Sequence, residues 1–192
     1  NMSYVFYLAK KFNIPLNNWK TLNVTNMEGM FREAALFNQD IGVWDVSNVT
    51  TMAAMFRQAI VFNQDISGWN VSNVQSMLVM FAGARSFNKN LSAWDVGLVT
   101  NTSNMFAGAI AFNNGGAALS WGNKTRNFSI MSGMFAGTSA LNPNVFNQYI
   151  GDWNVGSATL MEGMFQSPYR RLKEAIANEP KDIAGWRSVR WW

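Results

Sequence analysis

A 25-residue period runs through most of this chain and restricts it to repeat architectures. A unit of this size cannot bury its apolar face alone, so neighbouring copies must stack and share one core. The period therefore predicts one elongated domain of stacked coils. The tryptophans mark the period most plainly, at Trp19, Trp44, Trp69 and Trp94, with looser copies at Trp121 and Trp153.

Two further landmarks keep step with the tryptophans. A Phe-Asn dipeptide precedes each one, as in Phe37-Asn38, and a Met-x-x-Met-Phe motif follows, as in Met52, Met55 and Phe56. All 12 methionines and all but one of the 14 phenylalanines occupy these positions. Methionine fills irregular core gaps and aromatic rings supply large buried contacts, so we assign both to a stacked spine.

The pattern within one unit predicts a helix followed by a strand. Val74, Met77, Phe81 and Ala84 recur at helical spacing. Residues 66–71 repeat the L-x-x-L-x-L skeleton of a leucine-rich repeat strand. Residues 1–166 are therefore predicted to form a right-handed, leucine-rich-repeat-like α/β solenoid of six to seven coils of about 25 residues. Asn1-Met2 matches a mid-repeat position, so earlier residues are expected.

Residues 167–192 leave the period and are predicted to form a capping helix with a basic, aromatic tail. Pro168 and Pro180 bracket a helical pattern of about ten residues. The tail either folds back onto this cap or docks onto a protein partner or a membrane interface, where tryptophan and arginine are favoured. The candidate docking residues are Arg170, Arg171, Trp186, Arg187, Arg190, Trp191 and Trp192.

The combined motif, WDVSNVTxMxxMFxxAxxFNQDIS, resembles the surface-protein repeat of about 25 residues in BspA-like leucine-rich repeat proteins, also found in mycoplasma lipoproteins and in protists. The resemblance covers roughly residues 1–165. It implies a cell-surface or secreted repeat protein used in adhesion or protein binding. It assigns no catalytic residues and no cofactor.

Composition excludes several classes of function. The net charge is +4, and residues 169–192 hold six basic and three acidic residues, which leaves the repeats near neutral. Nucleic-acid binding needs a basic stripe that these repeats lack. The chain has no cysteine for disulfides or thiolate metal sites, and no histidine, the most frequent general base. We therefore expect no enzyme, no cofactor and no metal, and at most peripheral membrane contact.

The row of residues that follows the tryptophans is the candidate ligand-binding site. A leucine-rich strand would turn these side chains outward on its concave face, where they could bind a glycan, a peptide or a cation through oxygen ligands. The alternative is a solvated row that prevents association of sheet edges. The candidate residues are Asp45, Asn70, Asp95 and Asn154.

Other polar positions are better explained structurally. Asp40 and Asp65 share one phase, and their short side chains suit Asx turns rather than acid–base catalysis. Stacked amides of the Phe-Asn asparagines are expected to bond the backbone of the next coil. Extra residues enter near 114–117, between Trp121 and Met134, and near 138–144, where loops leave the solenoid and often carry recognition.

The sequence thus predicts a non-enzymatic repeat protein that serves as a protein-interaction or adhesion surface, outside the cell. One alternative is a structural accessory subunit of a larger or membrane-associated assembly, docked through the tail. A second alternative is a glycan-binding protein that uses the Asp/Asn row.

Overall fold

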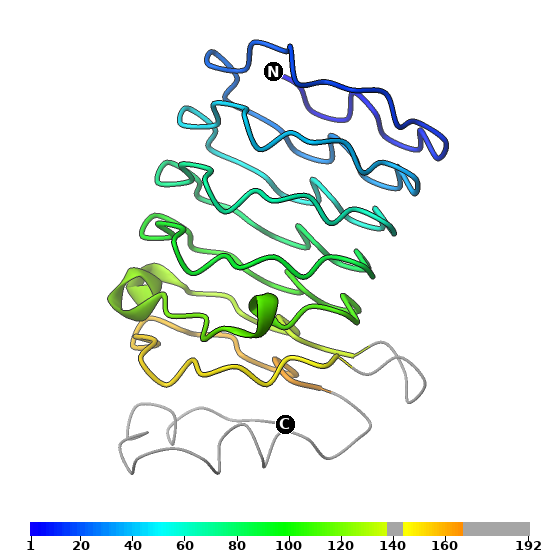
Figure 1. Cartoon of the computed structure of the whole chain (residues 1–192). Helices are drawn as coiled ribbons and strands as arrows, with labels where there is room; N and C mark the ends of the chain where they lie inside the picture. Colours follow the sequence, from blue (N-terminus) through cyan, green and yellow to red (C-terminus); the bar gives the residue numbers. More distant parts are fainter. Residues whose placement is uncertain (138–143, 167–192) are drawn as a thin grey trace.

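A computed structural model describes residues 1–137 and 144–166, and Figure 1 shows them as coils stacked along one axis. Each coil lies beside the next, so residues one period apart in the sequence are neighbours in space. Parallel bridges join one residue of each coil to its counterpart in the next, in the row Asn26, Thr51, Ser76, Asn101, Ile130 and Leu160. The expected repeat stack is therefore present.

The predicted α/β composition is wrong. The only helices among the described residues are two 3₁₀ helices, η1 (Asn114–Gly116) and η2 (Gly122–Asn127), drawn as green ribbons in Figure 1. The bridges between coils are isolated, so the described residues form no sheet and no leucine-rich-repeat strand. Turns build the coils instead. The predicted capping helix lies outside the described residues.

Alternating hydrogen bonds explain why apolar residues at helical spacing do not form a helix here. Met27, Gly29 and Phe31 donate their N–H groups to carbonyls of the next coil, at 2.8–3.1 Å. Met30 and, directly after Phe31, Arg32 donate instead to the carbonyl three residues earlier, at 3.0–3.2 Å. A helix needs all these donors inside one segment. The apolar residues therefore share one face through successive tight turns, and each turn is interrupted by a bond to the neighbouring coil.

This alternation places left-handed residues in the described coils, and most coils hold two of them, four positions apart, such as Gly29 and Glu33. At the first of these positions Gly29, Gly133 and Gly163 have φ between 58° and 63°, where glycine avoids the Cβ clash of other residues. Ala54 and Val79 hold the same conformation without that freedom. In the first coil the ring of Tyr4 lies where a Cβ on Gly29 would stand, so a larger residue there would displace that ring.

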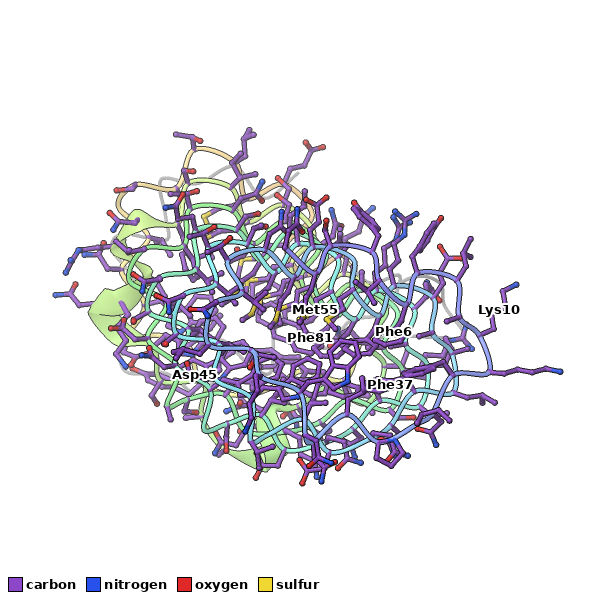
Figure 2. The ribbon with its side chains drawn as sticks, turned by 90° about the horizontal axis from the view of Figure 1, so that it is seen from above. Phe6, Lys10, Phe37, Asp45, Met55 and Phe81 are labelled. Atoms are coloured by element: carbon purple, nitrogen blue, oxygen red, sulfur yellow. The ribbon has the colours of Figure 1, made fainter. Side chains whose placement is uncertain are left out.

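Aromatic rings form the core of the stack. Phe31 and Phe37 stack within one coil at 3.8 Å between centroids, and Phe31 stacks on Phe56 of the next coil at 5.7 Å. Both kinds of contact recur along the chain, and Figure 2, which looks along the stack, places Phe37, Met55 and Phe81 inside the coils. These side chains are fully buried. The predicted spine of methionine and aromatic residues is confirmed.

Polar groups tie neighbouring coils together at fixed points. The indole N–H of Trp44 donates to the carbonyl of Leu16 at 3.0 Å, and Trp69, Trp94, Trp121 and Trp153 repeat this bond. The N–H of Asn38 donates to the side-chain oxygen of Asn13 at 2.9 Å, and this ladder continues through Asn113 to Asn147. The predicted bonding between coils by the Phe-Asn asparagines is thus confirmed.

We expect Thr21→Val to raise the free energy of unfolding by about 1–2 kcal/mol, because an unpaired buried hydroxyl costs that much. Thr21 is 2% exposed, and its hydroxyl finds no hydrogen-bond partner among the described residues. The same column of the repeat holds Val46 and Val71. Urea denaturation followed by tryptophan fluorescence measures the change.

Thr125→Val is the matched control, and it should lower the free energy of unfolding. Thr125 occupies the same column, but its hydroxyl is within donating distance of two backbone carbonyl oxygens, those of Gly122 at 2.8 Å and Asn154 at 3.0 Å. A loss of stability in both variants would contradict the assignment of an unpaired hydroxyl at Thr21.

Replacement of Gly29 by alanine should destabilise the stack by roughly 1–3 kcal/mol, because a Cβ adds left-handed strain and displaces the Tyr4 ring. Gly68→Ala is the control, since a Cβ at Gly68 meets no atom within 4 Å and its φ is not left-handed. Thermal unfolding should show a lower midpoint for the first variant and an unchanged or slightly higher midpoint for the second. Equal midpoints would refute the requirement for glycine.

Candidate binding site

Each residue of the predicted row closes a turn with the residue two positions later. The carboxylate oxygen Oδ1 of Asp45 accepts bonds from the N–H of Ser47 at 2.9 Å and from its hydroxyl at 2.6 Å. Asn70 does the same with Ser72, at 3.2 and 2.8 Å. These are Asx turns, which short polar side chains favour. The row therefore shapes the coil as well as facing solvent.

Asp95 and Asn154 complete the row with a glycine in place of serine. Their Oδ1 atoms each accept one bond at 3.1 Å, from the N–H of Gly97 and of Gly156 respectively. All four predicted residues are exposed. Asp45, Asn70 and Asp95 lie in consecutive coils, whereas η2 stands between Asp95 and Asn154. The structure thus brings the predicted residues into one row, and their ligand role stays a prediction.

The turns also fix the charge of the row. The hydroxyl of Ser47 and then its N–H hold the pKa of Asp45 below its usual value of 3.8. The N–H of Ser67 and then its hydroxyl lower the pKa of Asp65 in the neighbouring phase. Both carboxyl groups are therefore ionised at neutral pH, and they cannot serve there as proton donors. Asp40 and Asp65 close their own Asx turns, at 2.9 and 3.0 Å, as predicted.

Helix η2 carries the extra residues that follow Trp121 and is bonded to the coils on both sides. The amide of Asn127 donates to the carbonyl of Gly97 at 2.6 Å, and Lys124 Nζ donates to the carbonyl of Trp94 at 3.3 Å. On the other side, the amide of Asn154 donates to Asn123 Oδ1 at 2.9 Å. These hydrogen bonds therefore hold η2 in place at the end of the row.

A shallow, open hollow of about 350 Å³ lies where the row meets η2. Polar, charged and apolar side chains share its lining, and Leu98 is 49% exposed there. Sequence reasoning included Asp95 but missed Leu98, Lys124 and Arg126 as site residues. The break in the period after Trp121 was the available signal. The residues lining the hollow are Ser72, Asp95, Gly97, Leu98, Asn123, Lys124 and Arg126.

Asp152 adds an acidic group near the far end of η2. Partial burial raises its pKa, whereas bonds from its own N–H and from the N–H of Gly122 oppose that rise. Asp152 is not among the residues that line the hollow. Asp152 is therefore a neighbour of Asn154 in the chain and is not part of the hollow.

The remaining candidate sites were a cation site and the C-terminal tail. Within residues 1–137 and 144–166, no group of three or more acidic, histidine or cysteine residues could hold a metal ion. No helix in these ranges is long and apolar enough to cross a membrane. The predicted docking tail, Arg170 to Trp192, lies outside the described residues, so its role stays a prediction.

Replacing Ser47 by alanine should raise the pKa of Asp45 toward 3.8, because its hydroxyl bond is the largest cause of the lowered value. The pKa is lowered on folding, so the turn stabilises the fold above the pKa of the unfolded chain. This contribution is lost as pH falls through the folded pKa. Carboxyl carbon shifts in an NMR titration measure both variants. Ser72→Ala, next to the uncharged Asn70, is the control and should leave the Asp45 midpoint unchanged.

Comparison with known proteins identifies a family but no function. A family model described as "Mycoplasma protein of unknown function, DUF285" matches residues 1–121 and, in an overlapping copy, residues 94–179. No curated protein and no solved structure matches the chain. The family description mentions neither BspA nor leucine-rich repeats, so that resemblance stays a prediction. The two overlapping matches span most of the chain, as a repeat protein requires, and the chain belongs to this family of Mycoplasma proteins of unknown function.

Proposed function

We propose that the chain is a non-enzymatic binding module that presents a protein-interaction surface, displayed at the cell surface or secreted. The observation that carries this proposal is the exposed row Asp45–Asn70–Asp95, which ends in the hollow against η2. The resemblance to surface-protein repeats supports the location. The row offers oxygen and amide groups at a regular spacing, and the hollow interrupts that regularity with charge and an apolar side chain.

Preorganisation makes this row a suitable contact surface. Asp45 and Asn70 are each held by two bonds from the serine two residues later. Side chains that are already ordered lose less conformational entropy when a partner binds. The same argument applies to η2, whose Asn127 and Lys124 are bonded to the preceding coil.

A protein partner is favoured over a glycan because the tryptophan rings beside the row are buried. Sugar rings bind commonly through their apolar faces on exposed aromatic side chains. The tryptophans that directly precede the row residues, Trp44, Trp69 and Trp94, are at most 4% exposed. The hollow contains Leu98 and charged groups instead, a mixture that matches the side chains and backbone of a protein.

Site-specific photo-crosslinking tests the proposed function. The chain has no cysteine, so a single Gly68→Cys can be labelled with benzophenone maleimide two residues before Asn70. A side chain at Gly68 meets open space, so the label should not disturb the coil. After irradiation with intact cells and culture medium of the source organism, we expect a discrete protein adduct. Excess unlabelled chain should suppress that adduct.

The matched control is Arg85→Cys, an exposed position in the same repeat phase as Lys10. Figure 2 places Lys10 and Asp45 at opposite ends of the coil, so Arg85 lies far from the row. Arg85→Cys should give no adduct with the same protein. Identical adducts from both positions, or adducts with carbohydrate alone, would contradict a protein-binding row.

A further inference from the structure

We propose that the hollow between Asp95 and η2 binds an acidic side chain of a protein partner, an inference that rests on the proposed function. Lys124 and Arg126 both line this hollow, from the same inserted helix. The repeats on either side are near neutral, so these two cations are a local departure in charge. A carboxylate is the complementary group for such a pair.

Neither cation forms an ion pair with a carboxylate of the described residues. In the described part of the chain, the one ion pair joins Arg32 to Glu33, at 3.4 Å. The contact made by Lys124 is to a neutral group, the carbonyl of Trp94 at 3.3 Å. Arg126 is exposed. The positive charge of η2 is therefore available to a ligand, while the bond to Trp94 keeps Lys124 in place.

Asp95 also lines the hollow and favours a ligand that carries a single acidic group. Asp95 uses Oδ1 to accept the N–H of Gly97 at 3.1 Å. Its negative charge repels a second carboxylate and attracts N–H donors such as those of a peptide backbone. Leu98 gives an aliphatic contact beside it. The chemistry fits a peptide segment in which one acidic residue stands next to an aliphatic one.

NMR titration of the full chain with the acetylated, amidated peptide Gly-Glu-Leu-Gly tests this proposal. We expect shifts of the amide signals of Gly97, Leu98, Asn123 and Arg126, and affinity that falls in about 0.5 M salt, where exposed charges are screened. The Gly-Gln-Leu-Gly analogue should bind at least about fivefold more weakly, since it lacks the charge. Oligogalacturonate supplies the same carboxylate from a glycan.

Four variants make the test specific. Arg126→Gln should weaken binding about threefold and the Lys124→Gln, Arg126→Gln pair about tenfold, whereas Arg85→Gln should change nothing. Asp95→Asn should strengthen binding about threefold. Asparagine preserves the turn at that position, because Asn70 forms the same turn with Ser72. Arg126→Gln removes no contact that holds η2, so a folding defect cannot account for its effect.

Several outcomes would overturn the proposal. These are peptide shifts scattered along the stack, unchanged affinity in the double variant, weaker binding in Asp95→Asn, or binding of oligogalacturonate in place of the peptide. A protein adduct at Gly68→Cys without peptide binding would reject the acidic ligand and leave the proposed function standing. Loss of the adduct would reject the proposed function itself.

Discussion

The interaction on which the whole structure depends is the hydrogen bonding of each coil to the next. Coils made of turns leave many backbone groups without partners inside the coil, and buried groups of this kind must be paired. Here Gly29 and Phe31 reach the next coil through backbone bonds, and the Asn13–Asn38 step repeats along the side. The stacked phenylalanines set the spacing at which these bonds can form. Packing and polar pairing therefore require the same period.

The period, the core and the turn-forming role of Asp40 and Asp65 could be predicted from the sequence, because each follows from residue type and spacing. The secondary structure could not. Turns with a bond from one N–H to the carbonyl three residues back place Met77 and Phe81 on one face, much as a helix would. Whether this segment forms turns or a helix depends on whether Val79 adopts a left-handed φ of 49°, which its β-branched side chain disfavours. Stacking against the neighbouring coil overrides that local preference.

The candidate site also has one part that could be predicted from the sequence and one part that could not. The row Asp45–Asn70–Asp95 is a direct product of the period, so the sequence located it, although it also assigned the row to a concave sheet that does not form. The hollow arises where the period fails. Whether Lys124 and Arg126 line the row or point elsewhere depends on the bonds that Asn127 and Asn123 make to adjacent coils. Such contacts between segments cannot be read from spacing within one insertion.

The direction of the hydrogen bonds between coils has a mechanical consequence. These bonds run from coil to coil, and Figure 1 shows the coils following one another along the axis of the stack. Tension between the two ends therefore loads one boundary at a time, and the outermost coil peels away before its neighbour. Each detached unit of 25 residues increases the extended length of the chain by about 80 Å, at roughly 3.3 Å per residue. A stack of coils built this way lengthens in steps and dissipates work while the remaining coils hold.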